Sequence, residues 1–480
     1  MESESDDQSV NDENDFEEES SAASTDLDAE EIFSRDLPRV RNNDPDVKHL
    51  CCEGDYDIVQ NMTNEGWEDI GRDISNNTYL ETLDFNGGAL DDEKLSSLFR
   101  GLTKSSSIVN LDLDNNEFSR AGLISLEPFL QNSIKLREFD VTHNNIQSGG
   151  FNSLLQALHD SPIEYLFCAE CGISSIEIAS VPTNLRLLSI DGNHIQSEGF
   201  NRLLRSLRDS SIEVLKCINC GIESIEIDAD FFPRSLKELN LRSNRINTNG
   251  CRGVAKLLQK TNALEILFLS RNMIGDEGVA TLVDALKTNT SLSYLDLEDN
   301  DGISNIGHIL ILKMLNDISS IKATLHSNHT LRTVDSWNVH DDIEFHINMA
   351  TTTNRNDPIA AGREKVIQTQ LHSRRRAKLV GIQGLRSQSV YGEINPLHLP
   401  EVLSLVSRRH GQEELYLALK ASIAELLSTV NRTSFLQQRR AYHAAMLQEI
   451  DAELAAIKSA KGDAGDGKET HPRGIKRLRV

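Results

Sequence analysis

The stretch LKELNLRSNRI (residues 236–246) has leucine at its first, fourth and sixth positions, asparagine at its ninth and isoleucine at its eleventh. Positions 4 and 6 alternate with polar residues, the period of two that is expected of a short strand with one buried face. We number these positions 1 to 11 in every copy of the pattern. Four other full copies are IVNLDLDNNEF (108–118), LREFDVTHNNI (136–146), LRLLSIDGNHI (185–195) and LEILFLSRNMI (264–274).

Four further copies are less regular. They are LETLDFNGGAL (80–90), IEYLFCAECGI (163–173), IEVLKCINCGI (212–222) and LSYLDLEDNDGI (292–303). After position 11, most copies continue with a helical pattern, as in the face formed by Phe200, Leu203, Leu204 and Leu207. Strand and helix therefore alternate, which makes each strand parallel to the last. A single repeat cannot cover its apolar side, whereas stacked neighbours can.

This periodicity resembles that of the leucine-rich repeat family, in its ribonuclease-inhibitor-like class, over residues 80–303. The resemblance implies an α/β solenoid with parallel strands on the concave face and helices outside. We expect a helical C-terminal extension to follow it. From Ile146 to Ile195 and again from Ile195 to Ile246, a helical repeat precedes a short one. Pro182 and Pro233 disfavour helix in the short repeats, so the sequence predicts a duplicated two-repeat unit.

Two C-x-x-C pairs, Cys168/Cys171 and Cys217/Cys220, raise the alternative of zinc or redox chemistry. The repeats at 163 and 212 are separated by the repeat at 185, so the pairs should lie about 10 Å apart. Sulfurs on one zinc lie within about 4.6 Å of each other. The resemblance also implies that position 9, where Cys171 and Cys220 lie, accepts cysteine in place of asparagine. We therefore predict core thiols, with no metal and no cofactor.

The domain boundaries follow composition and periodicity. We predict an acidic disordered tail, an N-terminal cap that contains the helix around TNEGWEDIGRDIS and core Cys51 and Cys52, and a repeat array. One long helix through HILILKMLNDISSIKATL precedes a C-terminal cap around Leu331. A basic, partly helical linker, a helical region with a short coiled-coil seam, and a basic tail follow. The predicted ranges are 1–43, 44–79, 80–330, 331–357, 358–398, 399–460 and 461–480.

Charge is unevenly distributed along the chain, whose formal net charge is −25. Residues 1–36 carry −14, residues 355–480 carry +8, and −19 remains for the middle. This asymmetry favours steering of a protein partner, or contact between the tail and the C-terminal region, over a nucleic-acid-binding domain. A solvated solubility tail is the alternative. The segment 434–460 either folds back onto its neighbours or self-associates.

Neither a signal peptide nor an 18-residue apolar stretch is found, which predicts a cytoplasmic protein without a membrane partner. The basic stretches SRRRAK (373–378) and KRLRV (476–480) leave nuclear import as an alternative. GDAGDGKET (462–470) matches part of a P-loop, but no strand precedes it and Glu469 replaces Ser or Thr. Since neither a metalloprotease nor a nucleophile-elbow motif is present, we predict no enzymatic activity.

Residues that flank the buried strand positions should face the concave surface. The early repeats present acidic side chains there, and the middle and later repeats present aromatic and aliphatic ones. We expect a protein partner with a basic, partly apolar surface, or cover by the chain's own tail or C-terminal region. The alternative function that the resemblance allows is activation of a small GTPase. The candidate partner-binding residues are Asp84, Asp112, Asp114, Glu138, Asp140, Tyr165, Phe167, Leu187, Val214, Ile218, Ile266 and Phe268.

Overall fold

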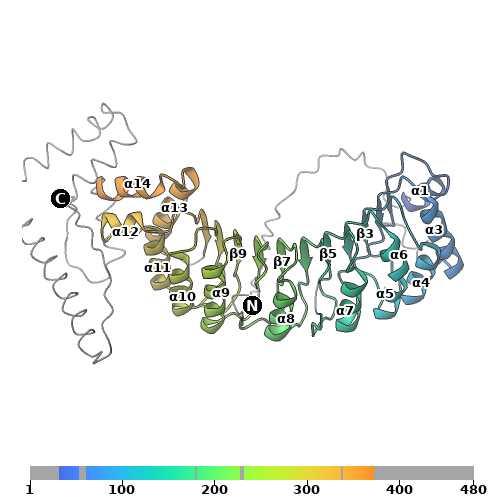
Figure 1. Cartoon of the computed structure of the whole chain (residues 1–480), viewed down its shortest axis with the longest axis horizontal. Coiled ribbons are helices and arrows are strands. Elements are labelled where there is room, and N and C mark those ends of the chain that lie inside the picture. Colours follow the sequence, from blue (N-terminus) through green and yellow to red (C-terminus); the bar gives the residue numbers. More distant parts are fainter. Residues whose placement is uncertain (1–31, 53–60, 179–180, 227–231, 337–338, 372–480) are drawn as a thin grey trace, which may run out of the picture. The chain divides into compact units, whose positions relative to one another are not determined.

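The structure is a computed structural model that describes residues 32–52, 61–178, 181–226, 232–336 and 339–371. The chain divides into two compact units, residues 1–245 and 246–480. In each unit short parallel strands alternate with helices along the chain, as Figure 1 shows. The predicted α/β architecture of parallel strands and intervening helices is thus confirmed in both units.

Apart from the first, the strands of the first unit occupy positions 3 to 5 of their repeats. Within the unit, each strand pairs in parallel with the next one along the chain. The side chain at position 4 is buried between flanking positions of intermediate exposure, as Leu83 and Leu111 illustrate. This alternation confirms the strand predicted from the period of two. The strands are β1 (His49–Cys51), β2 (Thr82–Asp84), β3 (Asn110–Asp112), β4 (Glu138–Asp140), β5 (Tyr165–Phe167), β6 (Leu187–Ser189), β7 (Val214–Lys216) and β8 (Glu238–Asn240).

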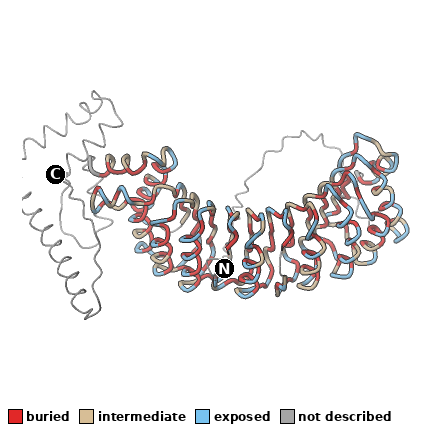
Figure 2. Tube along the Cα trace, viewed as in Figure 1, coloured by how far each residue is buried: buried red, intermediate tan, exposed pale blue. Residues whose placement is uncertain are grey.

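Helices of the first unit cover the strands from one side. They are α1 (Ile32–Arg41), α3 (Asn64–Asn76), α4 (Asp92–Gly101), α5 (Arg120–Ser125), α6 (Glu127–Asn132), α7 (Gln147–Ala157) and α8 (Gln196–Ser206). In α8, Phe200, Leu203 and Leu204 are buried, which confirms the predicted apolar face. Figure 2 shows the buried residues along the strands and along the helix sides that face them.

The short repeats contain no helix in their described residues, as Pro182 and Pro233 predict. The two-repeat unit also recurs in its hydrogen bonds. The backbone N–H of Gln147, at the start of α7, donates to Cys171 O over 2.9 Å, and that of Gln196, at the start of α8, donates to Cys220 O over 3.0 Å. The predicted duplication is therefore a duplication of local structure as well as of sequence.

The second unit follows the same plan. Strand β10 (Tyr294–Asp296) pairs in parallel with β9 (Ile266–Phe268) on one side and with β11 (Thr333–Asp335) on the other. A π-helical turn, η3, ends the described chain at Ile367–Leu371. The helices are α9 (Thr248–Lys260), α10 (Asp276–Leu286), α11 (Asn305–Leu315), α12 (Ile321–Leu325), α13 (Asp341–Asn356) and α14 (Ala361–Val366).

The predicted N-terminal boundary needs correction, because residues 32–41 of the predicted tail form helix α1. Phe33 of α1 is fully buried, and its ring lies 6.3 Å from that of Phe85. Trp67 of α3 lies 5.9 Å from the same ring. The first parallel strand, β1, also lies inside the predicted cap and pairs with β2. The acidic composition of this segment predicted disorder, but the aromatic contacts of Phe33 hold it in a helix.

Two predictions near the C-terminus are also wrong. The expected long helix is interrupted between α11 and α12, where Ser320 Oγ accepts a hydrogen bond from Ala323 N over 3.0 Å and caps the second helix. The boundary predicted after residue 357 lies too early, because Lys365 of α14 is fully buried. Its Nζ donates to Leu315 O over 2.6 Å and to Asn328 O over 3.1 Å. Burial lowers the pKa of Lys365 to about 7.

Several predictions lie outside the described residues. They concern the acidic tail up to residue 31, the basic linker beyond residue 371, the helical region 399–460 with its self-association segment, and the basic tail 461–480 with its import cluster.

Candidate functional site

The strand face of each unit consists of the side chains at positions 3, 5 and 7 of its repeats, which point away from the buried position 4. All twelve candidate residues lie at these positions and are of intermediate exposure. Ten of them belong to the first unit, and Ile266 and Phe268 belong to the second. The structure therefore places the first ten on neighbouring repeats of the first unit and the other two on the second unit.

An acidic column crosses the first strands at position 5. Asp84, Asp112 and Asp140 are register partners on β2, β3 and β4, so their Cα atoms follow the strand spacing of about 4.8 Å. Burial raises the pKa of Asp112 to about 6, with smaller contributions from the negative charges of Asp140, Asp84 and Asp114. Burial also raises the pKa of Asp140. Like charges held this close favour a cationic partner.

Backbone donors hold these carboxylates in place. Asp112 Oδ1 accepts a hydrogen bond from Asp114 N over 2.8 Å, and Asp140 Oδ1 accepts one from Thr142 N over 2.7 Å. His143 Nδ1 lies 2.8 Å from Asp114 Oδ1. No lysine or arginine in the described segments forms a salt bridge with Asp112 or Asp140. Asp112 and Asp140 therefore present negative charge that no lysine or arginine of the described segments neutralises directly.

An apolar segment adjoins the acidic column. Phe167 on β5 is the register partner of Asp140, so it continues the column directly. Tyr165, Leu187 and Val214 are register partners at position 3 of β5, β6 and β7. Half-exposed aromatic and aliphatic side chains in one row are typical of a surface that another molecule covers.

The sequence-based candidates omit several charged residues of this face, among them Lys216 and Asp191. Lys216 lies at position 5 of β7, between Ser189 on β6 and Asn240 on β8. Asp191 lies at position 7 of the preceding repeat. Asp191 accepts hydrogen bonds from Ile218 N over 2.6 Å and from Ser189 Oγ over 2.9 Å. Burial raises its pKa. Reading positions 5 and 7 of every repeat, rather than its acidic or aromatic members alone, identifies both residues.

The C-x-x-C pairs lie in the core, as predicted. The four cysteines are fully buried. Cys171 Sγ donates to Val141 O over 3.1 Å, and Cys220 Sγ donates to Ile190 O over 3.3 Å. Asn144 makes the equivalent bond to Leu113 O over 2.8 Å, so cysteine replaces asparagine as the donor at position 9. Burial raises the pKa of Cys171 to about 12, which keeps its thiol protonated at neutral pH and able to act as this donor.

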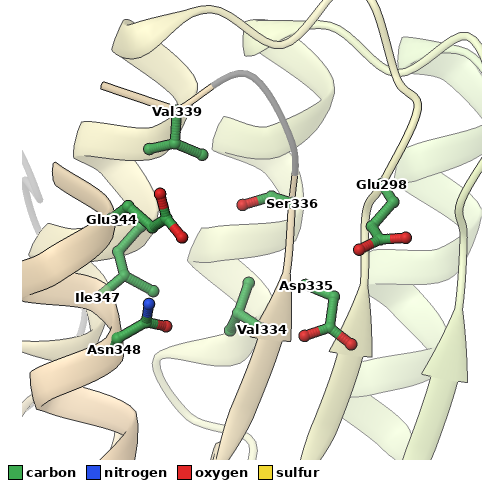
Figure 3. Close-up of a pocket in the computed structure, with 8 residues that line it drawn as sticks. All are labelled: Glu298, Val334, Asp335, Ser336, Val339, Glu344, Ile347 and Asn348. Carbon is green, nitrogen blue, oxygen red and sulfur yellow. The ribbon is translucent and has the colours of Figure 1, made fainter. Parts of the chain in front are cut away.

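In the second unit, an aromatic pair and an acidic pocket occupy the strand face. The rings of Phe268 and Tyr294 lie 5.2 Å apart, and the Tyr294 hydroxyl donates to the carboxylate of Asp335. A pocket of about 560 Å³ opens beside Asp335. Figure 3 shows Asp335 and Glu298 on neighbouring chain segments across from Glu344 of α13, with the apolar side chain of Val334 between the two sides.

The sequence did not identify this pocket, because Glu298 and Glu344 are distant in sequence and Glu344 belongs to a helix rather than to a repeat position. The three carboxylates can receive a basic side chain.

Within the described part of the chain, no helix combines the length and the apolarity that crossing a bilayer requires.

Comparison with models of known families agrees with the repeat pattern. A family model described as Leucine Rich repeat matches residues 132–154, 232–255 and 288–311. No curated protein sequence matches the chain. Similar solved structures include leiomodin-1 actin-binding site 2 (21% identity, 28% of this chain and 78% of that chain, TM-score 0.26). A chain from the yeast Rad7 and Elc1 complex has 15% identity, 64% and 66% coverage and a TM-score of 0.36. A chain from the Drosophila Toll–Spatzle complex has 14% identity, 56% and 37% coverage and a TM-score of 0.34.

Proposed function

Because the chain is a leucine-rich repeat protein, we propose that it is a non-enzymatic scaffold that binds a protein partner through the strand face of its first unit. The partner has a basic and partly apolar surface. One observation carries this proposal: Asp84, Asp112, Asp140 and Phe167 follow one another in register on four adjacent strands. Negative charge and an apolar anchor therefore share one continuous row.

The energetics of the row favour association. The carboxylates of Asp112 and Asp140 are partly removed from water, and their raised pKa values show that their negative charge is disfavoured in the free chain. Lysine or arginine side chains of a partner would compensate this charge and orient the encounter. Phe167, Leu187 and Val214 would bury their half-exposed surfaces at the same time and supply affinity.

The second unit offers the same two chemical components by itself. Ile266, Phe268 and Tyr294 form its apolar part, and Glu298, Asp335 and Glu344 form its acidic pocket. We infer that a basic side chain of a partner fits this pocket, since charge-assisted hydrogen bonds to carboxylates are stronger than neutral ones.

Affinity capture on the immobilised full-length chain tests the proposal. The test variants are Asp112→Lys with Asp140→Lys, and Phe167→Glu with Leu187→Glu. We expect the wild-type chain to capture a protein partner that neither variant captures. Its identity and its contact residues then follow from mass spectrometry and cross-linking.

Matched controls separate this face from general changes in charge or polarity. Asp160→Lys with Asp209→Lys makes the same charge change on exposed loops that follow α7 and α8, and Ile134→Glu makes a polar change at an exposed site. The controls should retain the partner. Equal capture by wild-type, test and control chains would contradict the proposal, and capture that increases on removal of residues 372–480 would show that the chain covers its own strand face.

A further inference from the structure

Three different metal-ligating side chains converge at the β1 end of the first unit. His49 and Cys51 lie two residues apart on β1, so both point to the strand face while Leu50 between them is fully buried. Cys51 is the register partner of Asp84 on β2. The acidic column therefore begins beside an imidazole and a thiol.

The distances among these side chains suit a small cation. Cys51 Sγ lies 3.5 Å from Asp84 Oδ2, and His49 Nε2 lies 3.8 Å from the same oxygen. The three ligand atoms all lie within 4.8 Å of one another. A tetrahedral zinc ion with ordinary bond lengths places sulfur about 3.5 Å and nitrogen about 3.3 Å from a carboxylate oxygen. The sulfur–oxygen distance already has this value, and the exposed imidazole of His49 needs to move closer to the carboxylate oxygen.

We propose that His49, Cys51 and Asp84 bind one zinc ion at this end of the strand face. Thiolate, imidazole and carboxylate are the ligands that zinc prefers, and three protein ligands leave a fourth position for water or for a partner's side chain. The Cys51 thiol donates to Asp84 in the metal-free chain, and zinc replaces that proton when it binds. Asp112, the register partner of Asp84, adds negative charge beside the site.

This site differs from the C-x-x-C pairs in its access to solvent. Cys168 and Cys171 are enclosed in the core, whereas His49 is exposed and Cys51 retains 8% of its surface. The sequence did not indicate this site, because Asp84 lies in a different repeat from His49 and Cys51, and only the strand register brings them together.

Metal titration of the full-length chain, first freed of metal with a chelator, tests the proposal. Cobalt(II) serves as the spectroscopic probe, because a thiolate ligand gives a charge-transfer absorption that histidine and carboxylate ligands alone do not give. We expect one cobalt ion per chain, with this absorption, and its displacement by zinc. Cys51→Ser should abolish the absorption, and His49→Gln and Asp84→Asn should each weaken affinity about tenfold or more.

Two control variants change a thiol and a histidine outside the proposed set of ligands. Cys52→Ser changes the adjacent buried thiol, whose Sγ lies 3.8 Å from Asn86 O, and His143→Gln changes an exposed histidine beside Asp114. Both should bind cobalt like the wild-type chain. Absorption that survives in Cys51→Ser, absent absorption in the wild-type chain, or unchanged affinity in His49→Gln would each overturn the proposal. The His49 variant keeps the test valid if Cys51→Ser unfolds, because His49 is exposed.

Discussion

At the scale of single residues, position 9 of the repeat joins each turn to its neighbours. Asn193 Nδ2 donates to Cys168 O and Ile190 O, both over 2.8 Å. Its Oδ1 accepts from Cys171 N over 3.1 Å and from Ile173 N over 2.9 Å. Cys171, at position 9 of the preceding repeat, contributes only a weak thiol donor. The same position therefore tolerates two residue types that differ greatly in how much they stabilise.

Substitution by alanine should reveal this difference. We expect Asn193→Ala to lower the free energy of unfolding by about 3 kcal/mol, because several buried backbone groups lose their partners. Cys171→Ala loses one weak hydrogen bond and little volume, and it should cost about 1 kcal/mol. Urea unfolding followed by circular dichroism measures both values. Equal losses would show that the amide contributes no more than the thiol does.

The charge of Asp112 should cost stability at neutral pH. Its folded-state pKa of about 6 lies above its ordinary value near 4, so between these limits the folded chain binds more protons than the unfolded one and stability rises as pH falls. We expect Asp112→Asn to raise the free energy of unfolding at pH 7 by about 1 kcal/mol, after allowance for solvent screening.

The gain from Asp112→Asn should disappear below about pH 4, where the wild-type carboxyl is protonated in both states. Urea unfolding at a series of pH values measures it. Asp160→Asn, on an exposed loop, is the control and should change little. A gain at pH 7 that persists unchanged in acid would show that charge is not its cause.

At the scale of elements, helices α3 and α4 approach each other at two glycines. A Cβ added to Gly71 would lie 2.1 Å from Leu98 O, and one added to Gly101 would lie 2.1 Å from Glu68 O. Neither backbone carbonyl can move without shifting its helix. The glycines therefore set the spacing between the first helices of the unit.

We expect Gly71→Ala to destabilise the chain by about 2 to 3 kcal/mol, because the contact is with backbone. Gly149→Ala in α7 is the matched control. Its added Cβ would meet only the flexible end of Arg120, at 2.8 Å, and alanine favours helix over glycine by about 1 kcal/mol. Thermal unfolding of the two variants should therefore shift in opposite directions or leave Gly149→Ala unchanged. A similar loss in both would point to the flexibility of glycine instead of helix spacing.

The sequence predicted elements well where the repeat pattern is dense. Strands β2 to β10 follow directly from the alternation at positions 4 and 6. Helix α1 was missed because acidic residues surround Phe33, whose packing against Phe85 depends on contacts distant in sequence. The break between α11 and α12 was missed because an apolar run conceals the cap formed by Ser320. Tertiary contacts and capping decide these cases, and periodicity does not detect them.

At the scale of the whole molecule, the strand face was predicted one repeat at a time, and its continuity depends on register. The order of Asp84, Asp112, Asp140 and Phe167 in one row requires each strand to align with the next without a shift. The sequence shows which residues occupy each position of a repeat, but it does not show how far packing buries those side chains. The pocket beside Asp335 and the ligand set at Cys51 were therefore found only in the structure.

Partner binding at this face should depend on salt. Raising ionic strength from about 0.05 to 0.5 M shortens the range of electrostatic attraction and should weaken capture by the wild-type chain. The double variant Asp112→Lys with Asp140→Lys should bind the partner weakly, and its affinity should depend little on salt. Phe167→Glu should also bind the partner weakly, but its affinity should still fall as salt rises. Dissociation constants measured across the salt series test this. A wild-type affinity that is insensitive to salt would exclude the acidic column as a major source of attraction.

Because the two-repeat unit is duplicated, one copy can be removed between structurally equivalent positions. Gln147 and Gln196 begin equivalent helices, both with left-handed backbone at φ 57° and 55°, and both follow a buried isoleucine. Excision of residues 147–195 would join Ile146 to Gln196 across matching geometry. The shortened chain should still unfold cooperatively by circular dichroism, with a smaller apolar surface to offer. Duplication or deletion of such a two-repeat unit lets a chain lengthen or shorten its binding surface while it keeps the same fold.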